Sequence, residues 1–222
     1  MGTAIGQMLP LAIGIAISPT TITATVLMLL SNAKSRTVAL LLGCLVGVGG
    51  AVALSTLLST LLPIQDSRGP SPAAGAIKLV AGGLFLVLAV SQWRARPTTG
   101  ERAELPKWVT AVDSMTPAKA LVLGLLLSAV VPKNLLLALS AGVILGETAP
   151  SVGQAAVVIL IFTAIATSTV ATPVVAHRVA PARMSGPLEQ LRDWLVDNNV
   201  TIMVVVLLVI GVVMIGNSIA SL

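Results

Sequence analysis

The chain has 222 residues, of which 56% are hydrophobic and 9% are charged. A soluble domain carries about 25% charged residues, so this composition excludes an ordinary soluble domain and indicates an integral membrane protein. The net charge of +5 does not indicate nucleic-acid binding, because the basic residues follow the loops between apolar stretches.

Six apolar stretches follow one another along the chain. They cover residues 5–30, 37–62, 73–92, 119–145, 152–176 and 198–220. A helix that crosses a bilayer needs roughly 20 such residues to span the hydrocarbon core, and its backbone groups are hydrogen-bonded within the segment. We expect the first stretch to be a membrane helix and not a cleaved signal peptide, since no basic residue precedes Lys34. The sequence therefore predicts an all-α membrane protein with six transmembrane helices.

Basic residues gather in alternate loops. The first, third and fifth loops and their edges hold ten of the thirteen, namely Lys34, Arg36, Arg94, Arg96, Arg102, Lys107, Lys119, Arg178, Arg183 and Arg192. The positive-inside rule makes these loops cytoplasmic, so we expect a plasma (inner) membrane protein with both termini outside. Trp93, Trp108 and Trp194 fall in the same loops, as interfacial anchors do.

Two of these loops contain short amphipathic segments. Leu105, Trp108, Val109, Val112 and Met115 recur at helical spacing, and so do Leu188, Leu191 and Leu195. Such segments either lie on the surface of the inner leaflet or dock onto the helix bundle. The sequence leaves both interpretations open.

Prolines stand near the middle of the first and fourth stretches. Pro19 lies in AISPTTITA, and Pro132 lies in AVVPKNLLL, 113 residues further on. Proline lacks an amide donor and clashes with the carbonyl four residues earlier, so each is expected to break its helix. The carbonyls expected to be freed are those of Ile15 and Ser128.

The same offset relates polar residues of the second and fifth stretches. It pairs Ser55 with Ser168, Thr56 with Thr169, and Ser59 with Thr172. Three helices per half is an odd number, so the second half enters the membrane from the opposite side. This predicts an inverted-topology repeat, a common transporter architecture. The predicted units are a first three-helix repeat (1–92), a cytoplasmic linker with a short amphipathic helix (93–118) and a second three-helix repeat (119–222).

Lys133 stands directly after the second proline, near the expected bilayer centre. A lysine there costs roughly 2.5–3.5 kcal/mol on insertion scales, and no Asp or Glu lies inside any predicted helix. Together with the positive N-terminal ends of the restarted helices, an unpaired ammonium favours a carboxylate, phosphate or sulfate ligand. Two alternatives stay open: Lys133 loses its proton during transport, or it caps carbonyls freed at a proline.

Substrate sites of inverted-repeat transporters lie at such breaks. The candidate substrate-binding or translocation residues are Ser18, Pro19, Thr20, Thr21, Ser55, Ser59, Pro132, Lys133, Asn134, Thr169 and Thr172. For the hydroxyl residues, plain helix packing is an equal alternative. We expect no enzyme activity, metal or cofactor, because Cys44 and His177 are single residues of their types and the acids are scattered.

Two motifs resemble a known family. LPLAIGIAISPTTITATVLMLLSNAKSRTVALLLGCLVG (9–47) looks like the start of the actinobacterial glycolipid- or sulfolipid-addressing proteins, the GAP family of the LysE exporter superfamily. VPKNLLLALSAG (131–142) resembles the second signature of that family. Val131 stands where the superfamily signature has asparagine, and Thr20 stands where many relatives have a proline or an apolar residue. The matching positions are Ser18 and Pro19 in the first motif and 132–134 in the second.

The resemblance implies a six-helix inner-membrane protein, in some cases dimeric. It also implies export or surface delivery of a lipid-linked anionic product such as a glycolipid, peptidoglycolipid or sulfolipid. Two alternatives remain: an exporter of amino acids or other small solutes, and an accessory scaffold for a larger lipid-export machinery. The partners expected are therefore membrane lipids and an anionic or amphipathic substrate, with no nucleic acid.

Overall fold

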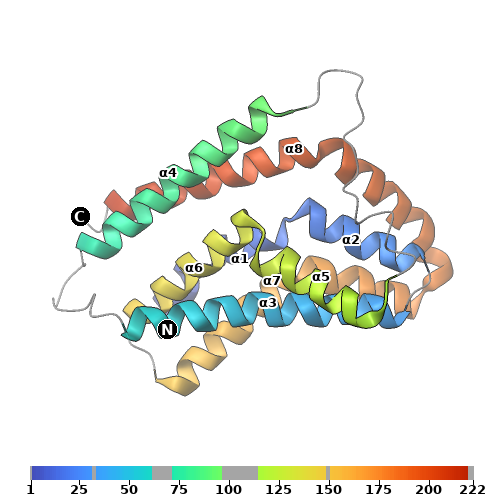
Figure 1. The fold of residues 1–222 in the computed structure, drawn as a ribbon, viewed down its shortest axis with the longest axis horizontal. Coiled ribbons are helices and arrows are strands. Elements are labelled where there is room, and N and C mark those ends of the chain that lie inside the picture. The colour runs from blue at the N-terminus through green and yellow to red at the C-terminus, as the bar shows by residue number, and fades with distance from the viewer. Residues whose placement is uncertain (1, 32–33, 62–71, 97–114, 149–150, 220–222) are drawn as a thin grey trace.

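The computed structural model describes residues 2–31, 34–61, 72–96, 115–148 and 151–219, and within them every regular element is an α-helix (Figure 1). The helices are α1 (Gly2–Ala16), α2 (Pro19–Leu30), α3 (Lys34–Leu61), α4 (Pro72–Arg94), α5 (Pro117–Ala129), α6 (Pro132–Glu147), α7 (Val152–Val179) and α8 (Pro181–Ile219). The prediction of an all-α protein is confirmed for this part of the chain.

Three described segments are long and apolar enough to cross a membrane: Ser35–Leu61, Val152–Val179 and Arg183–Gly216. The pairs α1–α2 and α5–α6 raise this number to five if each pair is one crossing. The segment Leu79–Arg94 of α4 is apolar but shorter. The protein thus has the character of a multi-pass membrane protein, while the sixth crossing stays a prediction.

Both predicted helix breaks are present. α1 ends at Ala16 and α2 begins at Pro19 with a bend of 51°, and α5 ends at Ala129 and α6 begins at Pro132 with a bend of 66°. Each proline occupies the first turn of the second helix of its pair. Its missing amide costs nothing there, because first-turn amides have no partner within the helix.

The helices pack across the two halves of the chain. α3 lies along α5 and α6, α7 contacts α1 and α2, and α4 lies along α8 (Figure 1). The main core cluster draws on several of these helices, with Met8, Phe85, Leu137 and Phe162 all buried. The breaks of α1–α2 and α5–α6 therefore lie inside the bundle, between α3, α7 and α8.

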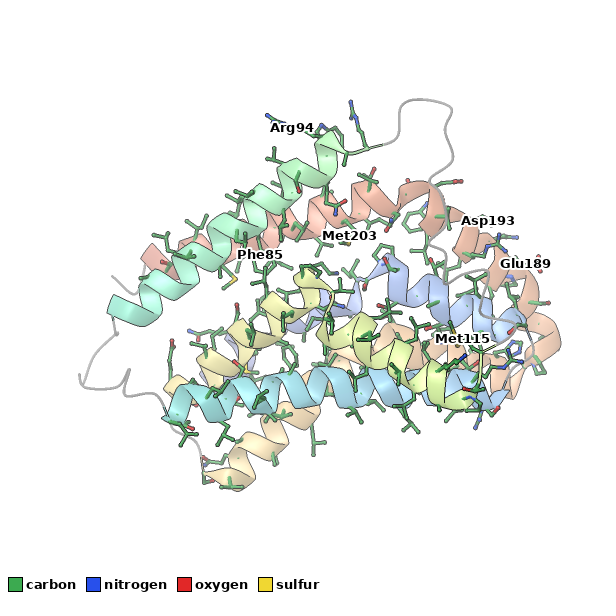
Figure 2. All side chains as sticks on the ribbon, viewed as in Figure 1. Phe85, Arg94, Met115, Glu189, Asp193 and Met203 are labelled. Atoms are coloured by element: carbon green, nitrogen blue, oxygen red, sulfur yellow. The ribbon has the colours of Figure 1, made fainter. Side chains whose placement is uncertain are left out.

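The polar and apolar side chains are distributed as in a membrane protein. Many large aliphatic residues are exposed on the long helices, including Val46, Val87, Leu160 and Val212. The start of α1 and the end of α8 lie towards the same end, on the left of Figure 1. Glu189 and Asp193 lie towards the opposite end (Figure 2).

The second amphipathic segment is part of a longer helix. α8 runs without interruption through Leu188, Leu191 and Leu195 into the predicted sixth transmembrane helix. Leu188 is buried and packs with Val26 and Leu29 of α2, which matches the docking alternative. The first amphipathic segment, apart from Met115, and most of the 93–118 linker lie outside the described residues.

Candidate functional site

The first break rearranges the hydrogen bonds at the end of α1. In a continuous helix, the amide of Ser18 would donate to the carbonyl of Gly14. Here it donates to the carbonyl of Ala16 instead, over 2.9 Å. The carbonyl of Gly14 thereby loses its helical partner, and the carbonyl of Ile17 lies between the two helices. A buried carbonyl of this kind needs another donor.

Lys133 supplies that donor from the other half of the chain. Its Nζ donates to the carbonyl of Gly14 and to the carbonyl of Ile17, both at 2.8 Å. The side chain is 2% exposed. Because backbone carbonyls at a helix C-terminus carry partial negative charge, the end of α1 stabilises the ammonium in place of a carboxylate. Lys133 therefore caps the α1–α2 break.

Thr169 of α7 contacts the same break from another side. Its Oγ1 donates to the carbonyl of Ala16 over 2.7 Å. Three carbonyls within four consecutive residues, those of Gly14, Ala16 and Ile17, thus accept from side chains of α6 and α7. We call this arrangement of Lys133, Thr169 and the three carbonyls the polar junction.

The second break is capped locally. The amide of Val131 donates to the carbonyl of Leu126, so the carbonyl of Leu127 loses the helical partner that Val131 would have supplied. The Nδ2 of Asn134 donates to this Leu127 carbonyl over 2.9 Å. Asn134 is 1% exposed, and its Oδ1 accepts no hydrogen bond. Lys133 and Asn134, neighbours in sequence, therefore cap different breaks.

The hydroxyls that follow the first break are turned inward. Ser18 and Thr21 are buried, and the Oγ1 of Thr21 donates to the Oγ of Ser18 over 3.1 Å. Pro19 is buried as well, whereas Thr20 is half-buried. The Oγ1 of Thr25 donates to the carbonyl of Thr21, a bond within α2. These residues line the start of α2, next to the polar junction in sequence.

Ser55 and Ser59 form a separate contact between α3 and α6. The Oγ of Ser55 donates to the carbonyl of Leu139 over 2.8 Å, and Ser59 reaches the carbonyl of Gly142 at 3.5 Å. A methyl group on Gly142 would lie 2.6 Å from the Oγ of Ser55, so the two helices require glycine there. This geometry agrees with the alternative interpretation of these two hydroxyls, in which they take part in close helix packing.

Two of the predicted residues lie on exposed faces. Pro132 and Thr172 are both exposed, and so is Ser168, whose hydroxyl donates to the carbonyl of Ile165 in its own helix. Among the six residues that the 113-residue offset pairs, only Thr169 therefore contacts a helix break.

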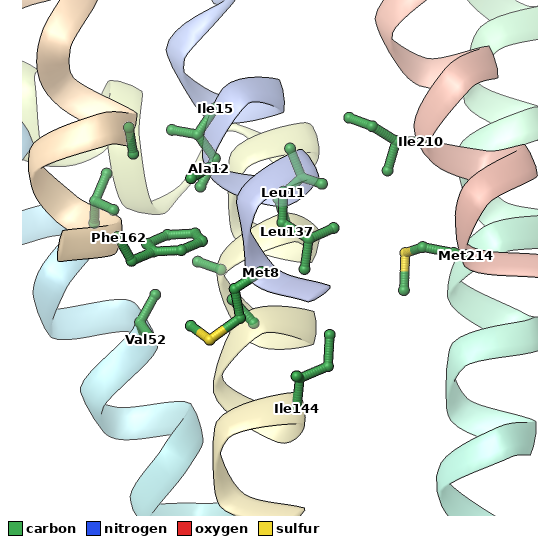
Figure 3. Close-up of a cluster of buried hydrophobic side chains, with 14 of the residues drawn as sticks. Met8, Leu11, Ala12, Ile15, Val52, Leu137, Ile144, Phe162, Ile210 and Met214 are labelled. Atoms are coloured by element: carbon green, nitrogen blue, oxygen red, sulfur yellow. The ribbon is translucent and has the colours of Figure 1, made fainter. Parts of the chain in front are cut away.

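An apolar groove lies between α1 and α7. It is lined by Ile5, Met8, Leu9, Ala12, Val158, Ile161, Phe162 and Ile165. The phenyl ring of Phe162 extends from α7 toward α1 near Met8 (Figure 3). The groove is narrow in this conformation, with a free volume of about 10 Å³. Among the described residues, no group of three or more His, Cys, Asp or Glu is arranged to hold a metal ion.

Sequence reasoning missed the acceptors of the polar junction. The proline rule pointed to Ile15 and Ser128, but the capped carbonyls belong to Gly14, Ala16, Ile17 and Leu127. Backbone carbonyls have no signature in a sequence, and only the spatial neighbourhood of α1, α6 and α7 selects them. The groove likewise depends on the pairing of α1 with α7.

Comparison with known proteins gives one family. The family model described as Sap, sulfolipid-1-addressing protein (SfLAP), matches residues 8–220. The match includes both breaks, the polar junction and nearly all of the groove. No curated protein and no solved structure matches the chain.

Proposed function

Because this chain belongs to the SfLAP family of sulfolipid-1-addressing proteins, we propose that it moves a lipid-linked anionic compound across the inner membrane for delivery to the cell surface. The compound is a glycolipid, peptidoglycolipid or sulfolipid, and the protein acts as a secondary transporter and not as an enzyme. The proposal accords with the apolar, multi-pass character of the helices.

The observation that carries the proposal is the position of Lys133. It is a buried ammonium held by two neutral carbonyls, with no carboxylate bonded to it in the part of the chain that the structure describes. Intramembrane charges usually mark substrate or ion pathways, because burying them without a role is costly. A sulfate or phosphate group is a stronger acceptor for an ammonium than a carbonyl is. An anionic substrate can therefore replace the carbonyls as the partner of Lys133.

The broken helices provide a route for this exchange. Lys133 extends from α6, in the second half, to the end of α1, in the first half. Loss of these two bonds leaves the bond from Thr169 to Ala16 as the remaining hydrogen bond between the halves at the polar junction. In transporters with inverted repeats, one repeat rocks against the other around a central site. We propose that the capped arrangement is the substrate-free conformation, and that substrate binding releases it.

The apolar groove favours a lipid over a polar solute. A solute exporter needs a polar cavity that closes around its substrate, whereas the groove between α1 and α7 is lined by apolar side chains only. A lipid-linked compound uses apolar surface of this kind for its chains. This contrast ranks lipid delivery above the export of amino acids.

The test compares surface-extractable lipids and secreted solutes among four strains. One lacks the protein, and the others carry the native chain, Lys133→Met or Lys119→Met at equal protein level. Lys119 is an exposed basic residue at the start of α5 and serves as the control. We expect one anionic lipid class to be lost from the surface without the protein. Native chain and Lys119→Met restore it, whereas Lys133→Met does not.

The other outcomes assign different functions. Unchanged surface lipids with a polar metabolite retained inside the cells would replace lipid delivery by solute export. Full restoration by Lys133→Met would make the polar junction a structural feature. The chain would then act as a scaffold for a larger export machinery.

A further inference from the structure

We propose that the groove between α1 and α7 binds one acyl chain of an anionic lipid, whose charged headgroup lies at the polar junction beside Lys133 and Thr169. This deepens the proposed function and rests on it, because it names the surface that holds the lipid part of the substrate. The groove is defined by the eight lining residues given above.

The two helices that line the groove lie in register. α1 and α7 both run towards the α1–α2 break. The hydrogen bond from Thr169 to Ala16 places a residue of α1 beside the residue of α7 whose number is higher by 153. The same offset places Ile5 beside Val158 and Ala12 beside Ile165, and all four residues line the groove. The groove therefore follows α1 for about 10 Å, from Ile5 to Ala12, at 1.5 Å per residue.

The apolar groove ends one helical turn before the polar junction on both helices. From Ala12 to Ala16, and from Ile165 to Thr169, is one helical turn, or about 6 Å. The carbonyl of Ala16 accepts from Thr169, and that of Ile17, the next residue, accepts from Lys133. A ligand along the groove thus meets apolar side chains first and then a hydroxyl and an ammonium.

This order of surfaces selects the chemical class of the ligand. A neutral lipid would leave the ammonium without an anion, and a small anionic solute would leave the groove unused. An anionic lipid satisfies both parts, because its chain covers apolar surface and its headgroup accepts from Lys133. A phosphate headgroup and a sulfate headgroup would both accept from Lys133 in this way.

The groove has a buried floor and an exposed rim. Its floor includes Met8, Ala12 and Phe162, which are buried, while Leu9 and Ile161 form a rim at 37% and 38% exposure. Ala12 has the smallest side chain of the lining residues and stands at the end nearest the polar junction. An acyl chain enters sideways between the rim residues, which are aliphatic and change rotamer readily.

The experiment uses full-length protein in phosphatidylcholine vesicles with one of two photoactivatable lipids. These are phosphatidylglycerol or phosphatidylcholine, each with a diazirine in one acyl chain, and labelled peptides are mapped by mass spectrometry. We expect phosphatidylglycerol to label 5–12 and 158–165 about fivefold more than phosphatidylcholine does, the ratio that corresponds to about 1 kcal/mol. Excess unlabelled phosphatidylglycerol should prevent this labelling of the native protein. This competition control requires no substituted variant.

Two substitutions test the parts of the site separately. Ala12→Leu fills the groove and should lower its labelling about fivefold, whereas Ala53→Leu, on an exposed position of α3, should not. Lys133→Met should make the two lipids label equally. Labelling of exposed residues of α4, such as Val87, should stay constant throughout.

Equal labelling of the groove by the two lipids in the native protein would overturn the inference, since it would mark general contact with bilayer lipid. So would labelling that neither Ala12→Leu nor competing phosphatidylglycerol reduces. The strain comparison separates the two proposals. Suppose that Ala12→Leu abolishes labelling of the groove but a strain with this variant keeps normal surface lipids. The groove would then be rejected as the substrate site, and lipid delivery would be retained. If the groove labels as expected in vesicles but the strain that lacks the protein keeps its surface lipids unchanged, lipid delivery alone is rejected.

Discussion

Lys133 shows how a charged residue is accommodated at a helix break. Its ammonium has two carbonyl acceptors at 2.8 Å and lies at the C-terminal end of α1. It also belongs to the first turn of α6, whose positive end disfavours a cation. The long side chain resolves this conflict by carrying the charge away from its own helix to the negative end of another.

Lys133→Met is therefore expected to destabilise the protein. The substitution keeps an unbranched side chain but leaves the carbonyls of Gly14 and Ile17 without their donor. Side-chain hydrogen bonds in membrane proteins average about 0.6 kcal/mol each and reach about 1.7, so a loss of about 1–3 kcal/mol is expected. Thermal unfolding of the purified protein measures it, with Lys119→Met as the control. Equal stability of the two variants would mean that water or another donor replaces Lys133.

At the scale of helices, small residues set how closely α3 approaches its neighbours. A methyl group on Gly43 would meet the carbonyl of Leu121 and lie 2.9 Å from the amide nitrogen of Leu125, both in α5. A methyl group on Gly124 of α5 would meet the carbonyl of Leu40. Backbone atoms cannot move aside as a flexible side chain can, so these two glycines are required where the helices cross.

Gly43→Ala and Gly50→Ala provide a matched pair in one helix. Gly43→Ala should separate α3 from α5 and cost about 1–3 kcal/mol, as overpacking does. Around Gly50 there is open space for a methyl group, and alanine has the better helix propensity, so Gly50→Ala should be neutral or slightly stabilising. Resistance to thermal unfolding and the yield of folded protein distinguish them. If both variants behave alike, the close crossing does not limit stability.

At the scale of the whole molecule, the packing agrees with two interchanged halves. α3 contacts the broken pair of the second half, α7 contacts the broken pair of the first, and α4 pairs with α8. Exchanging the halves interchanges the first two of these contacts and maps the α4–α8 contact onto itself. This pattern supports the inverted repeat, which stays a prediction together with the sixth crossing and the orientation in the membrane.

Labelling of single cysteines tests that orientation. Cys44 is buried, and Cys44→Ala removes it as a background. Thr148 follows α6 and Ala95 follows α4, and both are exposed. With six crossings and the predicted orientation, a membrane-impermeant maleimide should label Thr148→Cys on intact cells and Ala95→Cys only after permeabilisation. The reverse pattern would place the termini inside, and labelling of both positions on intact cells would reject six crossings.

The sequence alone determined the helical class, the membrane character and the positions of both breaks. These features depend on local properties: the length of an apolar stretch, and the missing amide and rigid ring of Pro19 and Pro132. The two motifs around these prolines were also sufficient to indicate the family, which the match over 8–220 shows. Lys133 was recognisable as unusual because charge is costly in hydrocarbon wherever it points.

Only the tertiary structure decided what Lys133 contacts. Its acceptors are 116 and 119 residues away. The carbonyl of Gly14 became free because the amide of Ser18 shifted to the carbonyl of Ala16, and the carbonyl of Ile17 lies between α1 and α2. The groove depends in the same way on the register of α1 and α7, which Thr169 fixes at Ala16. A sequence records which side chains need partners, but the partners here are backbone carbonyls and paired helix faces, and these are chosen by how the two halves pack.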